Sequence, residues 1–157
     1  MSASSGFSSD VLRFDAATET ERIVAGIRKI VLRQLKRGGA VIGVSGGIDS
    51  SVVAFLCSRA LGKERVLALF TPETESSTDS LRLGRMVAET LGVRATVEDI
   101  SAILETAQCY KRRDEAVQRV VPEYGSGYRC KIVLPSMHDA PCDALFSVVV
   151  RAPDGQT

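Results

Sequence analysis

The sequence contains no tryptophan, a single histidine and few aromatic residues of any kind. Its four cysteines form no C-x-x-C pair, and His138 has no neighbours at a metal-ligand spacing, which argues against a zinc site. Unpaired, scattered cysteines are typical of a reducing compartment rather than of a disulfide framework, so we predict a cytoplasmic protein. The cysteines are Cys57, Cys109, Cys130 and Cys142.

The sequence also lacks an excess of charge of either sign and any long hydrophobic run. The 20 basic and 19 acidic residues leave a formal net charge of +1, which argues against a nucleic-acid partner. No apolar run approaches the roughly 20 residues that span a bilayer, so we predict no membrane contact. With 157 residues, 45% of them hydrophobic, the chain can bury a core of its own.

Strand-like and helix-like segments alternate over the first two thirds of the chain. A possible capping box at Thr18 and Glu21 begins a first helix, which Gly38-Gly39 ends. This rhythm predicts the α/β class, with a doubly wound parallel sheet and helices on both faces. The predicted strands are Ala40–Val44, Arg65–Phe70 and Val93–Val97, and the predicted helices that follow them are Ser50–Leu61, Asp79–Leu91 and Ser101–Ala107.

The last third of the chain has a different pattern. Residues 108–121 are charged and predicted to be helical, and two more strands are expected at Lys131–Leu134 and Leu145–Val150. The chain closes on a Pro-Asp-Gly turn with no strand after it, which favours part of a longer protein over a natural C-terminus. We therefore divide it into a flexible leader (1–14), an α/β domain (15–121) and a β-containing extension or insertion (122–157).

A polar, glycine-rich loop separates the first predicted strand from its helix. It reads S-G-G-I-D-S-S over Ser45–Ser51, lacks the Lys of the Walker pattern, and has Ser45 where the dinucleotide fingerprint needs glycine. Gly46 and Gly47 would let main-chain N–H groups approach an anion beside the positive end of the next helix. Ser45, Ser50 and Ser51 would add hydroxyl donors, so the loop is typical of a phosphate site.

Asp49 is the member of this loop that a phosphate would repel. A bound Mg²⁺ would remove the conflict, because Mg²⁺ is usually held by one or two carboxylates together with phosphate oxygens. A capped turn without a ligand is the alternative, since Asp and Ser are favoured N-caps. The location of the loop, at the carboxyl end of a parallel strand, favours the ligand site.

The order strand, SGGIDSS, helix resembles the PP-loop of the ATP pyrophosphatases, which split ATP between the α and β phosphates. The stretch LFTPETESSTDSLRLGRMVAETLGVRATVEDIS looks like the corresponding part of the NAD synthetase family. There a strand ends in a Pro, a Ser/Asp-rich loop follows, and a helix ending in L-G leads to the next strand. The resemblance spans residues 20–107 and implies an adenine nucleotide alpha-hydrolase-like fold.

The resemblance also implies a reaction. ATP would activate the carboxylate of deamido-NAD as an adenylate, and ammonia would displace AMP to form the amide. A homodimer is expected on the same ground, and no catalytic side chain is assigned. The implied ATP-phosphate ligands are Ser45, Gly46, Gly47, Ser50 and Ser51, the Mg²⁺ ligand is Asp49, and the adenosine contacts lie around Leu69–Pro72, including Phe70.

Two other functions remain open from the sequence. One keeps the PP-loop but inserts sulfur or thiolates a substrate, with Cys130 or Cys142 as the reactive group. The other is a non-catalytic nucleotide-binding subunit of a larger assembly. One feature supports this non-catalytic subunit: the second acidic Mg²⁺ ligand and the phosphate-neutralising lysines of the family have no clear match after Val121.

Overall fold

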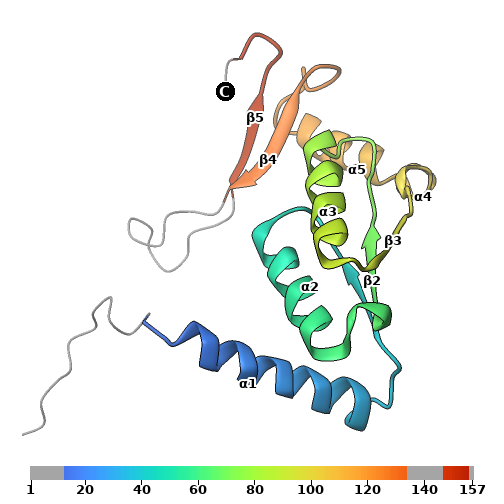
Figure 1. Cartoon of the computed structure of the whole chain (residues 1–157). Helices are drawn as coiled ribbons and strands as arrows, with labels where there is room; N and C mark the ends of the chain where they lie inside the picture. Colours follow the sequence, from blue (N-terminus) through green and yellow to red (C-terminus); the bar gives the residue numbers. More distant parts are fainter. Residues whose placement is uncertain (1–12, 134–146, 156–157) are drawn as a thin grey trace, which may run out of the picture. The chain divides into compact units, whose positions relative to one another are not determined.

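The computed structural model describes residues 13–133 and 147–155, in two compact units, Met1–Ser101 and Ala102–Thr157 (Figure 1). Within the described residues, no helix has the length and apolar character needed to cross a membrane. The boundary between the units lies after Ser101, whereas the sequence predicts a domain boundary near residue 121. A domain over 15–121 and a leader over 1–14 therefore stay predictions.

A parallel sheet forms the centre of the first unit. Its strands are β1 (Ala40–Gly43), β2 (Val66–Phe70) and β3 (Arg94–Val97), hydrogen-bonded in the order β1-β2-β3. The predicted α/β class with a parallel sheet and flanking helices is thus confirmed. The three described strands follow the order of the sequence, so the reversal of strand order that defines a doubly wound sheet does not occur among them.

Helices connect these strands at nearly the predicted positions. The first helix has two parts. Its α-helical part, α1, continues into a π-helical segment that ends before Gly38-Gly39. A short 3-10 turn, Lys63–Arg65, leads into β2. The helices are α1 (Ala16–Arg28) with its extension η2 (Lys29–Gln34), α2 (Ile48–Leu61) and α3 (Thr78–Leu91).

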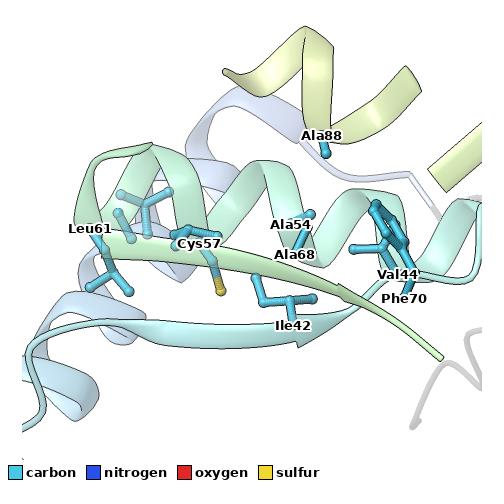
Figure 2. Packing of buried hydrophobic residues seen from close by; sticks show 11 residues of the cluster. Ile42, Val44, Ala54, Cys57, Leu61, Ala68, Phe70 and Ala88 are labelled. Carbon is cyan, nitrogen blue, oxygen red and sulfur yellow. The ribbon is translucent and has the colours of Figure 1, made fainter. Parts of the chain in front are cut away.

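The core of the first unit lies between the sheet and helices α2 and α3, and α1 adds Val24 to it (Figure 2). Alternate residues of β1 and β2 face it, with Val66 and Ala68 each only 1% exposed, because successive strand residues point to opposite faces. On the other face Val41 is 63% exposed. Helices on the second face of the sheet stay a prediction.

Helix α1 begins on a different cap from the predicted one. The Asp15 carboxylate accepts hydrogen bonds from the N–H groups of Ala17 (3.0 Å) and Thr18 (3.3 Å) and from the Thr18 hydroxyl (2.6 Å). Glu21 pairs with Arg59 of α2 instead of reaching back to the helix start. The Thr18–Glu21 capping box is therefore wrong, because a carboxylate three residues earlier takes the free N–H groups.

The second unit contains two short helices and an antiparallel strand pair. The helices are α4, which begins at Ser101 and ends at Thr106, and α5 (Cys109–Gln118). Strand β4 (Arg129–Val133) pairs with β5 (Ser147–Arg151), which confirms the small β-containing part near the C-terminus. Cys142 and His138 lie outside the described residues.

Candidate nucleotide-binding site

The diglycine loop joins the carboxyl end of β1 to the start of α2, as predicted. The buried Val44 extends the strand, and its N–H donates to the carbonyl of Leu69 at 3.0 Å. Helix α2 then begins at Ile48, with Gly47 as its N-cap residue and no side-chain cap. Asp49 therefore lies inside the first helical turn, and the interpretation of this segment as an Asp- or Ser-capped turn is wrong.

The start of α2 differs from the starts of the two other long helices. Asp15 caps α1 through its side chain and Ser77 caps α3, whereas Gly47 has no side chain to offer. The first N–H groups of a helix have no partner within the helix, and the helix dipole adds partial positive charge there. The loop thus meets a helix end whose main-chain donors can face an anion.

The serines of the loop form hydrogen bonds within the loop itself. The Gly47 carbonyl accepts hydrogen bonds from the hydroxyls of Ser51 (2.8 Å) and Ser50 (3.1 Å), while the Gly47 N–H donates to Ser45 Oγ at 3.3 Å. Ser45 Oγ and Ser50 Oγ lie 3.1 Å apart and share a further hydrogen bond. These predicted site residues therefore lie together in one network, and their contact with phosphate stays a prediction.

The two glycines of the loop have different surroundings. Gly46 has a φ of +79°, and a Cβ placed on it would lie 2.7 Å from the Ser80 carbonyl oxygen and 2.9 Å from Leu83 Cβ. Gly47 has a φ of −76°, and its Cβ would meet only Ser45 Oγ, at 3.4 Å. Gly46 thus allows the loop to pack against α3, while the surface of Gly47 stays open for a ligand to approach.

Asp49 is exposed in the first turn of α2. Among the residues that the structure describes, no group of three or more His, Cys, Asp or Glu side chains could hold a metal ion. A protein-only metal cage is therefore not available there. A single exposed carboxylate beside a phosphate loop does fit Mg²⁺, which commonly takes one or two carboxylates and completes its shell with phosphate oxygens and water.

A pocket of about 360 Å³ opens beside the loop. It joins the carboxyl ends of β1 and β2, so it brings the predicted adenosine segment next to the predicted phosphate loop. The predicted site lacked the three lining residues that follow Pro72, although the turn-rich loop after the second strand was expected at this edge. The lining residues are Gly43, Val44, Ser45, Phe70, Thr71 and Pro72, together with the missed Ser76, Ser80 and Leu81.

Hydrogen bonds order the outer wall of this pocket. The carbonyls of Phe70 and Pro72 accept the N–H groups of Glu98 (2.8 Å) and Ile100 (3.0 Å), which anchors the end of β2 to the chain that follows β3. Beyond Pro72, the N–H of Glu73 donates to the Ser76 hydroxyl at 3.0 Å. Hydrogen bonds within the protein therefore hold this wall in place without a ligand.

A parallel sheet with a pocket at its carboxyl edge, and with the sequence SGGIDSS in the loop beside that pocket, is the arrangement expected of an α/β protein of the PP-loop type. A family model described as NAD synthase matches residues 19–123, a span that contains the loop, the pocket and the helices between them. The chain belongs to the NAD synthase family. The resemblance drawn from SGGIDSS and the second loop is thereby confirmed.

Curated relatives place the chain among larger proteins. It is 49% identical to the NH(3)-dependent NAD(+) synthetases of Mesorhizobium japonicum and Rhizobium meliloti, over 93% and 96% of its own length. It covers only 46% and 45% of those two proteins, so it spans about half the length of the relatives it matches.

Solved structures show the same fold. An NH3-dependent NAD synthetase from Campylobacter jejuni, in complex with a nitrate ion, matches with a TM-score of 0.57 and 29% identity, over 69% of this chain and 50% of that one. The NMN synthetase from Francisella tularensis matches with a TM-score of 0.58 and 23% identity, over 64% of this chain and 41% of that one. The second match supports the fold alone.

Proposed function

We propose that this chain is the ATP-binding part of an ammonia-using NAD synthetase, a ligase that forms a C–N bond. The observation that carries the proposal is the NAD synthase match over residues 19–123, which includes both the diglycine loop and the pocket beside it. The names of the relatives, NH(3)-dependent NAD(+) synthetases, support ammonia as the nitrogen donor.

The proposed reaction begins with ATP held at the carboxyl edge of the sheet. Main-chain N–H groups of the loop and of the first turn of α2 bind the phosphates, and the pocket lined by Phe70 and Pro72 takes the adenosine. The carboxylate of deamido-NAD attacks the α-phosphorus, and pyrophosphate leaves with the bonding electrons. Ammonia then adds to the adenylate carbonyl, loses a proton and expels AMP, which leaves the amide.

The contribution of this chain is to position ATP and to stabilise charge. Fixed N–H donors aimed at the leaving pyrophosphate act without reorganising during the reaction. Mg²⁺, when bound between Asp49 and the phosphates, would neutralise part of the charge that accumulates there. The serine network fixes the backbone that carries these donors.

The comparisons favour this reaction over sulfur insertion or thiolation. Cys130, one of the two cysteines considered for that chemistry, lies on β4 and accepts a hydrogen bond from the Tyr124 hydroxyl at 3.4 Å. The pKa of Tyr124 is raised to about 12, first by this hydrogen bond and then by burial, so the phenol keeps its proton at neutral pH. Cytoplasmic location and a homodimer stay predictions.

The decisive experiment measures turnover by the full-length protein that carries this sequence. Sustained release of AMP and pyrophosphate is expected only when ATP, Mg²⁺, deamido-NAD and ammonia are all present, and without ammonia at most one equivalent of pyrophosphate per site is expected. ATP binding without any such release would favour the non-catalytic subunit, and absence of ATP binding would refute both.

The metal role is tested by Asp49→Asn. We expect the affinity for ATP with Mg²⁺ to fall about tenfold or more, the range typical for disturbing a metal site. Affinity for ATP without Mg²⁺ is expected to stay level or rise, because a carboxylate that repels phosphate is removed. Glu19→Gln is a matched control, since Glu19 also lies in the first turn of a helix, α1. Equal Mg²⁺ dependence in Asp49→Asn and the parent would contradict the assignment.

A further inference from the structure

Helix α3 presents a glycine, rather than a side chain, to the end of β2. Gly84 is buried, and a Cβ placed on it would lie 2.9 Å and 3.1 Å from two ring carbons of Phe70 and 3.3 Å from the Val44 carbonyl oxygen. Real Cβ atoms essentially never come within 3.0 Å of such neighbours. The Phe70 ring therefore lies against the backbone of α3 because Gly84 has no side chain.

The contact connects α3 to the nucleotide pocket. Phe70 is only 3% exposed, and Phe70 and Val44 both line the pocket, whereas Gly84 does not. Figure 2 shows these two side chains close together at the same end of the core. Any group added at position 84 would thus act on the pocket first through the Phe70 ring, whose carbons lie nearest to it.

The same turn of α3 also supports the diglycine loop. A Cβ on Gly46 would lie 2.7 Å from the Ser80 carbonyl oxygen and 3.2 Å from the Gly84 nitrogen. The helix is held in place on either side of this turn, by the Ser77 cap at its start and by the buried Ala88 further along. The segment Ser80–Gly84 is therefore a fixed surface against which both the loop and the pocket wall are built.

Glycine is unfavourable inside a helix, so its presence at position 84 calls for a local reason. Gly26 in α1 provides a comparison, because a Cβ there would have nothing within 4 Å. At Gly84 an aromatic ring and a strand carbonyl come so close that only glycine fits, whereas at Gly26 no neighbour requires glycine.

We propose that Gly84 is a positioning residue for the nucleotide site, one that sets the place of the Phe70 ring and so the shape of the wall against which the nucleoside lies. This inference rests on the proposed function, namely that the pocket binds ATP. Because α3 is anchored on both sides of Gly84, a methyl group at this position displaces the ring rather than the helix. The displaced ring enters the nucleoside side of the site and leaves the loop Ser45–Ser51 in place.

The test compares Gly84→Ala with the parent in the full-length protein, and uses ATP with Mg²⁺ and inorganic pyrophosphate as two separate probes. We expect ATP affinity to fall about tenfold, since a ring displaced into the site overpacks the space that the nucleoside needs. Pyrophosphate affinity is expected to change by less than about twofold, because the loop that binds it is unaltered. The matched control Gly26→Ala is expected to change neither affinity.

A second variant separates positioning from general damage. In a Phe70→Leu background the ring is gone, so Gly84→Ala is expected to have no further effect on ATP affinity, the signature of two residues that act through one contact. If thermal unfolding shows that Gly84→Ala alone does not fold, Phe70→Leu alone is used: its ATP affinity is expected to fall while its pyrophosphate affinity stays within about twofold, and equal changes in both would overturn the inference.

Three results would overturn the inference alone: unchanged ATP affinity in folded Gly84→Ala, equal loss of ATP and pyrophosphate affinity, or an undiminished effect of Gly84→Ala in the Phe70→Leu background. Failure of the parent to bind ATP would instead overturn the proposed function, and the positioning role with it.

Discussion

Alanine substitutions at the two adjacent glycines of the loop are expected to have very different costs. In Gly46→Ala the new residue must keep a φ of +79°, which costs a non-glycine residue about 1–2 kcal/mol. Its Cβ would also lie 2.7 Å from the Ser80 carbonyl oxygen and 2.9 Å from Leu83 Cβ. Relieving such overpacking costs about 1–3 kcal/mol, so the free energy of unfolding is expected to fall by about 2–5 kcal/mol.

Gly47→Ala is the matched control. Its φ of −76° and ψ of 162° suit any residue, and its Cβ would meet only Ser45 Oγ at 3.4 Å. We expect the free energy of unfolding to change by no more than about 0.5 kcal/mol, as for a substitution that touches no special feature. The difference between the two variants therefore isolates the contact of Gly46 with α3.

Thermal unfolding followed by circular dichroism measures the difference. In a protein of this size each kcal/mol shifts the unfolding midpoint by about 2–4 °C, so Gly46→Ala is expected to melt about 4–20 °C below the parent and Gly47→Ala within about 2 °C of it. Urea denaturation should give the same ranking with an unchanged m-value. Equal midpoints for the two variants would refute the assignment of Gly46 to a packed, left-handed position.

Two further predictions concern ionisable groups. Hydrogen bonds from the Thr18 side chain and from the N–H groups of Thr18 and Ala17 hold the pKa of Asp15 below its ordinary value. Its contribution to stability is thus present at neutral pH and lost as pH falls through the folded-state pKa, so the melting difference between Asp15→Ala and the parent should shrink between about pH 7 and about pH 2. The phenol transition that Tyr124→Phe removes from an absorbance titration should lie near pH 12, because the bond to Cys130 raises its pKa, and loss of a transition near pH 10 instead would contradict that bond.

Sequence periodicity predicted the alternation of strands and helices well, because it depends on local spacing. It was less reliable for the face that a helix turns inward. The helical spacing of the apolar residues predicts that Met86 faces the core, and this is wrong, because Met86 is 51% exposed while Gly84 and Ala88, four residues apart, are buried. A rule that looks for large apolar side chains misses a helix face made of small ones.

For the candidate site, too, local features could be predicted from the sequence and features that depend on tertiary contacts could not. The loop could be predicted from SGGIDSS and its place after a strand, since both are features of the linear sequence. The distinct roles of Gly46 and Gly47 could not, because they depend on how closely α3 approaches. Ser76 and Ser80 were not named as site residues although their loop was expected at this edge, because which residues of a loop line a pocket depends on its folded backbone.

The hydrogen bonds within the loop bear on the thermodynamics of ligand binding. Ser50 and Ser51 already hold fixed rotamers through the Gly47 carbonyl, at 3.1 Å and 2.8 Å. Ordering a mobile side chain at a binding surface costs about 0.5–1.5 kcal/mol, and here that loss of conformational entropy occurs during folding. Because these two hydroxyls donate their protons to the Gly47 carbonyl, what they preorganise is the loop backbone, and an anion bound by its N–H groups is less opposed by ordering of the protein.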